Sequence, residues 1–189
     1  MRVGAVSPSS PALADAITAE ITPACAPVIE LGPGTGVFTQ SLIRRGIPED
    51  QLALIERGGA FARRLRINFP RAHVLHMDAA RLAEVELFDG ERAGAVVSGL
   101  PLLLMPPRKV TALLAAAFEQ LRPDAAFYQF TYGLEPPVPR RTLDRLGLEV
   151  VRAGGTLANV PPATVYRIRR RRAHAADWRA AARALRASD

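Results

Sequence analysis

The chain has 189 residues, 49% of them hydrophobic and 23% charged, which is typical of a globular protein with a substantial core and excludes a disordered chain. No run approaches the roughly 20 apolar residues that a membrane-crossing helix needs, so no spanning segment is predicted, and no secretory signal is visible. The net charge of +7, carried almost entirely by arginine, favours a polyanionic partner: nucleic acid, an anionic membrane surface or a phosphate-bearing substrate.

Strand and helix patterns alternate along the whole chain. The predicted elements are a helix capped by Ser9 or Ser10, a strand at 28–31, a helix at 37–45, a strand at 52–56, a helix at 59–68, strands at 73–77 and 93–97, a helix at 108–121, a strand at 125–131, and strands at 148–152 and 164–169. Such alternation predicts an α/β fold with a mostly parallel, seven-stranded, Rossmann-like sheet and helices on both faces. The last two strands are expected to form an antiparallel hairpin.

The domain organisation and the compartment follow from simple features. The chain has no internal repeat and no long linker, so we expect one domain over 1–189, with an N-terminal segment and helix at 1–22 and a basic tail at 173–189. The single Cys25 can form neither an internal disulfide nor a metal cluster, which indicates a reducing cytoplasm. No metal site is predicted.

A glycine-rich turn, Gly32-Pro33-Gly34-Thr35-Gly36, directly follows the first predicted strand. A dinucleotide-binding turn needs its third glycine one position later, where Val37 stands, and a phosphate-binding loop needs a lysine that is missing here. A buried strand with an acid before Gly-x-Gly-x-Gly resembles motif I of the class I S-adenosylmethionine-dependent methyltransferases. The resemblance implies that all five residues of the turn contact S-adenosylmethionine, whose product would be S-adenosylhomocysteine.

Three acidic residues are expected at successive strand ends, where α/β sheets collect their ligands. Glu30 is placed to hydrogen-bond the amino group of the cofactor, Glu56 to hold both ribose hydroxyls, and Asp78 to accept from the adenine amino group. Their neighbours Arg57 and Ala79 are expected to contact the cofactor as well. Each acid alone is equally consistent with a solvated loop, but the three together favour a cofactor site.

The segment after the fourth predicted strand, Ser98-Gly99-Leu100-Pro101-Leu102, bears on the methyl acceptor. Amino-methylating enzymes often carry Asn/Asp-Pro-Pro-aromatic here, and rRNA adenine dimethylases carry Asn-Leu-Pro-aromatic. In this chain Ser98 replaces the amide and Leu102 replaces the aromatic ring, so a flipped base would lose a stacking interaction of about 1–3 kcal/mol. We therefore expect an acceptor that is more apolar and not planar.

Several segments together resemble the bacterial phospholipid N-methyltransferases, which convert phosphatidylethanolamine towards phosphatidylcholine. In chain order they are 4–10, 30–36, 98–101, 129–133 and 159–166. The resemblance implies a class I methyltransferase fold related to that of the rRNA adenine dimethylases, a phospholipid substrate, and a peripheral position on the anionic inner face of the cell membrane. It also implies that the segment from Val6 to Ser10, including Ser9, covers the cofactor.

The catalytic requirement is modest, because methyl transfer mainly needs a neutral nitrogen aligned with the methyl group. Tyr132 is the best candidate to orient this nitrogen and to face the growing ammonium, a cation–π contact of about 0.5–2 kcal/mol. Ser98 is a candidate hydroxyl acceptor for the amine and is also expected to contact the cofactor. Leu100 and Pro101 are expected to line the substrate site with Tyr132. The alternatives are a packing tyrosine and a turn serine.

Basic residues are candidates for holding the lipid phosphate. The two predicted pairs are Arg108-Lys109 and Arg140-Arg141, since such side chains pair with phosphate, although each is also consistent with a solvated loop. The tail at 173–189 is consistent with binding to an anionic leaflet or with a frayed end.

Two other enzyme classes remain as alternatives, an rRNA adenine N6-dimethyltransferase and a small-molecule N-methyltransferase. Ser98, Leu102 and the lack of a sizeable C-terminal helical RNA-binding domain disfavour the first, so no nucleic-acid partner is expected. The intact acids at 30, 56 and 78 argue against a binding module with a vestigial cofactor fold. The number of methyl groups transferred and the oligomeric state are left open.

Overall fold

Seven strands form one sheet in the order β3-β2-β1-β4-β5-β7-β6 in the computed structural model, which describes residues 10–157 and 161–171. The strands are β1 (Val28–Leu31), β2 (Leu52–Glu56), β3 (His73–His76), β4 (Ala93–Ser98), β5 (Leu121–Tyr132), β6 (Leu148–Thr156) and β7 (Ala163–Arg170). The first five strands pair in parallel, and β7 is antiparallel to both β5 and β6. The predicted Rossmann-like class I methyltransferase sheet with its antiparallel C-terminal hairpin is confirmed.

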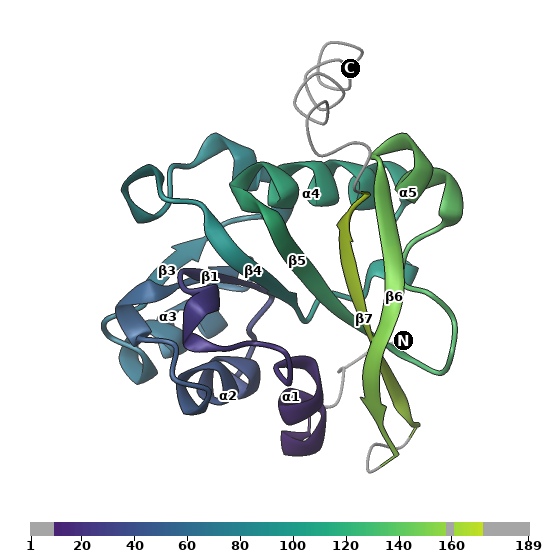
Figure 1. Ribbon diagram of the computed structural model, residues 1–189. Coiled ribbons are helices and arrows are strands. Elements are labelled where there is room, and N and C mark those ends of the chain that lie inside the picture. Colours follow the sequence, from purple (N-terminus) through teal and green to yellow (C-terminus); the bar gives the residue numbers. More distant parts are fainter. Residues whose placement is uncertain (1–9, 158–160, 172–189) are drawn as a thin grey trace.

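Helices cover both faces of this sheet (Figure 1). The helices are α1 (Pro11–Ile17), α2 (Val37–Arg44), α3 (Gly59–Asn68), α4 (Pro107–Gln120) and α5 (Arg140–Arg145), with 3₁₀ turns at Pro23–Cys25, Glu49–Gln51, Ala79–Glu84, Phe88–Gly90 and Leu102–Leu104. Buried residues of α1, α2 and α3 share a core with Val28 and Val97, whereas those of α4 and α5 share a second core with Ile29 and Val96. Alternate residues of β1 and β4 therefore face opposite layers, as the pleat of a strand requires.

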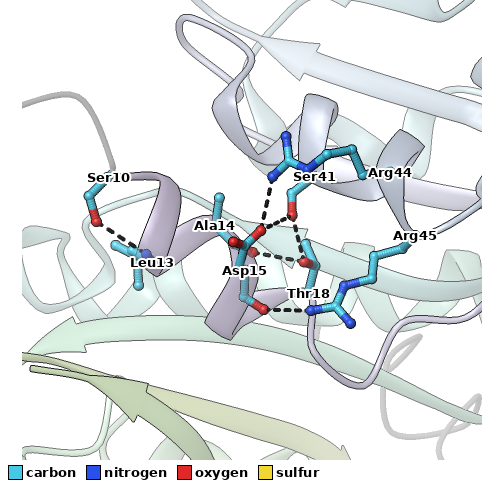
Figure 2. A network of polar contacts seen from close by, with 8 residues as sticks. All are labelled: Ser10, Leu13, Ala14, Asp15, Thr18, Ser41, Arg44 and Arg45. Carbon is cyan, nitrogen blue, oxygen red and sulfur yellow. Dashed lines mark hydrogen bonds and ion pairs between the residues drawn. The ribbon is translucent and has the colours of Figure 1, made fainter. Parts of the chain in front are cut away.

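The N-terminal helix α1 is fastened to α2 by a polar network (Figure 2). The Ser10 hydroxyl accepts from the Leu13 amide at 3.1 Å and caps α1, as one of the two predicted caps. Thr18 and Ser41, both buried, lie 2.9 Å apart through their hydroxyls, and Ser41 donates to Asp15 at 3.0 Å. The network fixes the start of the described chain over the helix that follows the glycine-rich turn.

The C-terminal part of the fold differs from the prediction in three places. Helix α5 was not predicted, β5 begins at Leu121 immediately after α4, and β6 continues to Thr156. Arg170 of β7 binds the α4–β5 junction, where β5 follows α4 without a loop. Its guanidinium donates to the carbonyls of Arg122 (2.8 Å) and Phe118 and lies over the Phe118 ring.

Candidate active site

The glycine-rich turn lies at the carboxyl edge of the parallel strands, between the ends of β1 and β4. Gly32 has a positive φ of 68°, which favours glycine, and a Cβ there would also fall 2.6 Å from Cδ2 of Leu100 in the loop after β4. Gly34 has a positive φ of 55°, and a Cβ there would meet nothing within 4 Å. The turn thus packs closely against protein at one glycine and faces open space at the next, which suits a ligand that approaches the backbone.

Glu56, the last residue of β2, is bound to the glycine-rich turn. Its Oε2 accepts a hydrogen bond from the Gly34 amide at 3.1 Å, and its Oε1 accepts from the Gly58 amide at 2.6 Å. The carboxylate is nearly buried at 8% exposure. Each carboxylate oxygen has capacity for another donor, so the predicted grip on ribose hydroxyls is compatible with these contacts.

Glu30 on β1 is fully buried beneath the same turn. Its Oε2 accepts from the Thr39 hydroxyl of α2 at 2.6 Å, and its Oε1 has no hydrogen-bond partner among the described residues. Burial raises the pKa of this carboxyl to about 8, with the Thr39 hydrogen bonds opposing the shift and nearby Glu56 adding to it. An unpartnered buried carboxyl oxygen close to the glycine turn is compatible with the predicted contact with the amino group of the cofactor.

Asp78, beyond the end of β3, is tied to its own loop and to α4. Its Oδ1 accepts from the Ala80 amide at 3.0 Å, and its Oδ2 lies 2.7 Å from the Lys109 ammonium, which holds the pKa of this carboxyl below its usual value. Ala79 is buried in the core, whereas Arg57 is exposed. Lys109, which was predicted to hold a lipid phosphate, therefore lies at the cofactor edge, where its ammonium group is paired with Asp78.

The loop after β4 is held by a residue that was not predicted as a site residue, Gln129 of β5. Ser98 and Gln129 are cross-strand partners, and both are buried. The Gln129 amide donates to the carbonyls of Leu100 (2.9 Å) and Phe130 (3.0 Å), and the Ser98 hydroxyl accepts from the Leu100 amide at 3.3 Å. In the sequence, Gln129 stands out only as part of the segment 129–133, which carries the family resemblance.

Tyr132 ends β5 at the same edge and is 38% exposed. Its ring packs edge-on against Phe130 at 5.4 Å, and Phe130 packs edge-on against Phe38 of α2 at 6.0 Å. Because side chains alternate along a strand, Tyr132 faces the α2 layer, and the Gln129–Ser98 pair faces the α4 layer. The two predicted catalytic residues thus share an edge without sharing a face.

The structure does not bring all predicted residues to this edge. Arg108 at the start of α4 and Pro101 in the loop after β4 do lie there, and both are exposed. Arg140 and Arg141 begin α5, where Arg140 lies 3.9 Å from Asp144, which in turn pairs with Arg171 beyond the end of β7. That is the opposite edge of the sheet, because the other end of β7 pairs with Tyr132. Val6, Ser9 and the tail at 173–189 lie outside the described residues.

The fold and this edge together define a class I S-adenosylmethionine-dependent methyltransferase. The fold matches that of a glycopeptide N-methyltransferase, MtfA, complexed with S-adenosylmethionine (TM-score 0.64, 14% identity, 90% of this chain and 100% of the other). It also matches a TehB-like S-adenosylmethionine-dependent methyltransferase from Corynebacterium glutamicum (TM-score 0.62, 15% identity, 84% and 88%). No protein-family model matches the chain.

Sequence similarity places the chain more narrowly. An ornithine lipid N-methyltransferase from Singulisphaera acidiphila is 33% identical over 169 residues, which cover 87% of this chain and 86% of the relative. The chain belongs to the family of this methyltransferase, and its cofactor is S-adenosylmethionine. The predicted methyltransferase class is thereby confirmed, whereas the specific resemblance to phosphatidylethanolamine-methylating enzymes is not.

Proposed function

We propose that the protein N-methylates the amine of a membrane-lipid headgroup. The observation that carries the proposal is the 33% identity, over most of both chains, to an ornithine lipid N-methyltransferase. The loop after β4 supports it, because Leu102 is 3% exposed and packs into the core where base-methylating enzymes present an aromatic ring. The described loop therefore offers no stacking surface for a nucleic-acid base at this position.

The positions of the basic side chains bear on the headgroup. Of the four cations predicted to hold a phosphate, Lys109 is paired with Asp78, and Arg140 and Arg141 lie at the opposite edge. Arg108 is the member of this set that is exposed at the cofactor edge. An ornithine headgroup offers an amine without a phosphate, so these positions favour it over phosphatidylethanolamine, the substrate that the sequence resemblance predicts.

The residues of the edge divide the work of the reaction. S-adenosylmethionine supplies, when bound, an electrophilic methyl group. The glycine-rich turn, Glu30 and Glu56 are the residues that would hold it, through backbone amides and carboxylate oxygens. A lipid amine arrives as an ammonium and has to lose a proton before its nitrogen can attack, and a poorly solvated site lowers the pKa of an amine.

Tyr132 and Ser98 then have different roles. Tyr132 is partly exposed, so its ring and hydroxyl are available to orient the nitrogen and to face the ammonium that forms. Ser98 is fully buried and already accepts from the Leu100 amide, which suits a residue that shapes the acceptor loop. Together with Gln129 it fixes the Leu100 carbonyl and amide.

The proposal is tested by offering the purified full chain methyl-labelled cofactor with one acceptor at a time. The acceptors are vesicles containing ornithine lipid, vesicles containing phosphatidylethanolamine, ribosomal RNA and free ethanolamine. We expect label in a lipid, with ornithine lipid labelled faster than phosphatidylethanolamine. Label in RNA or in ethanolamine alone, or in no acceptor despite cofactor binding, would overturn the proposal.

A further inference from the structure

Large apolar side chains are exposed together at the cofactor edge. Leu103, Leu104, Tyr132, Leu134 and Leu157, here called the leucine rim, are five of the seven large hydrophobic residues that are exposed in the described part of the chain. Leu104, Leu134 and Leu157 are 84%, 74% and 87% exposed. Single exposed leucines are ordinary on a protein surface, but a group of them rimmed by polar residues marks a binding surface.

The leucine rim comes from three loops that follow neighbouring parts of the sheet. Leu103 and Leu104 lie in the turn after β4, Leu134 follows β5, and Leu157 follows β6. The ends of β5 and β6 are level, because Tyr132 and Thr156 both pair with Ala163 of β7. The Gln129 bond to the Leu100 carbonyl joins the loop after β4 to β5.

Hydrogen bonds hold the turn after β5 in place. The Tyr166 hydroxyl donates to the Leu134 carbonyl at 2.6 Å, the Thr131 hydroxyl donates to the Glu135 carbonyl at 2.9 Å, and the Gly133 amide donates to the Pro162 carbonyl at 2.9 Å. The fold therefore presents Leu134 outward instead of letting it collapse onto the sheet. Because the backbone of this turn is already ordered, it loses little further freedom on binding, which favours association.

We propose that the leucine rim inserts into the surface of a lipid bilayer containing anionic lipid and so sets the acceptor loop at headgroup level. This inference rests on the proposed function, because a lipid substrate has to reach the site from a membrane. Charge supports this occupant: Arg57 and Arg108 are exposed at the same edge, no ion pair among residues 10–157 and 161–171 involves either, and the chain carries a net charge of +7. No helix within these ranges is long and apolar enough to cross a bilayer.

The test compares vesicle binding of the full chain and of the triple variant Leu104→Ser/Leu134→Ser/Leu157→Ser. Vesicles of phosphatidylcholine with phosphatidylglycerol are sedimented with the protein. We expect the triple variant to partition about tenfold or more weakly, because each leucine loses several buried methylene groups. The matched control is Ile67→Ser, since Ile67 is 78% exposed near the end of α3, at the opposite edge of the sheet, and should bind as the wild type does.

Cofactor affinity and the unfolding midpoint confirm that the variants are folded. Unchanged vesicle binding by the folded triple variant would overturn the inference, as would an equal loss in Ile67→Ser. A monomer–dimer equilibrium that the triple substitution abolishes, with vesicle binding intact, would assign the leucine rim to a second copy and overturn it too. Vesicle binding is measured without methyl transfer, so failure of the proposed function would appear separately in the labelling experiment.

Discussion

The carboxylate of Glu56 accepts a hydrogen bond from the backbone amide of Gly34 at 3.1 Å and so joins the end of β2 to the turn after β1. The same carboxylate accepts from Gly58 on its own loop. One nearly buried acid therefore orders two of the loops that form the cofactor edge. This preorganisation favours cofactor binding, because the carboxylate oxygens of Glu56 are already oriented before the cofactor arrives.

Replacing Glu56 with alanine should weaken S-adenosylmethionine binding roughly 10- to 100-fold, the loss expected for charge-assisted hydrogen bonds of about 1.5–3 kcal/mol. Isothermal titration calorimetry measures this directly. Glu49→Ala is the matched control, because Glu49 lies just before the other end of β2 and also accepts a backbone amide bond, from Arg71 at 2.6 Å. Equal affinities for the two variants would show that the ribose assignment is wrong.

Gln129→Met should lower kcat/KM for the lipid acceptor while leaving cofactor affinity unchanged. Methionine keeps the volume but removes both hydrogen bonds that fix the Leu100 and Phe130 carbonyls, at a cost in stability of about 1–3 kcal/mol. Gln120→Met controls for stability alone, because Gln120 also donates to two carbonyls, those of Leu82 and Val85, away from the cofactor edge. A similar fall in kcat/KM for both variants would mean that Gln129 acts only through stability.

Tyr132→Ala should reduce turnover about 2- to 30-fold, the range of a cation–π contact, with a much smaller change in cofactor affinity. Tyr132→Phe separates the two parts of the side chain, because it keeps the ring against Phe130 and removes the hydroxyl. Steady-state kinetics on dispersed lipid measures both variants. Wild-type turnover in Tyr132→Ala would exclude this residue from the mechanism.

The buried Glu30 should make the protein less stable as the pH rises from about 4.5 towards 8. In this window the folded state keeps a proton on Glu30, since burial raises its pKa from 4.5 to about 8, while the unfolded chain has released it. Each unit of difference corresponds to about 1.4 kcal/mol, so the free energy of unfolding should fall by a few kcal/mol. Denaturant unfolding at a series of pH values measures the slope.

Glu30→Gln provides the control for this pH dependence, because glutamine keeps an acceptor for Thr39 and cannot ionise. The variant should show a flatter profile between pH 5 and 8. Asp78 does not affect stability in this pH range. Its pKa is lowered in the folded state, so its contribution to the free energy of unfolding is lost only when the pH falls below the ordinary value of 3.8. Parallel profiles for the two proteins would contradict a protonated Glu30.

The sequence predicted the order and type of nearly all elements because most strands here are short apolar runs bounded by glycine, proline or charged residues. The exceptions have local causes. Leu121 looks like the end of a helix in the sequence, yet it is the first residue of β5 and pairs with Ala93, the first residue of β4. The pairing of the two strands is irregular after this point, which accommodates Pro123. Strand β6 continues through Gly154 and Gly155, although two glycines in a row suggest the end of a strand. Glycine is needed at position 155 because a Cβ there would fall 2.6 Å from the Ala163 carbonyl oxygen of β7.

The candidate site was predictable where it depends on position along a strand and unpredictable where it depends on side-chain partners. Glu30, Glu56 and Asp78 follow from strand ends, which the topology brings to one edge. The Asp78–Lys109 pair joins positions 31 residues apart, and nothing in the local pattern specifies it. The distance of Arg140 from this edge likewise follows from α5, an element too short for periodicity to reveal.

Strand β7 lies between β5 and β6, although it is the last of the three to be synthesised. A ribosome that has released the chain as far as Thr156 has therefore made β6 but not the strand that it pairs with. The seven-stranded sheet can be completed only after Arg170 has emerged. Until then, β5 keeps an unpaired edge. Nascent chains that stall before this point should depend on chaperones, and the sheet should be completed only once β7 has left the ribosome.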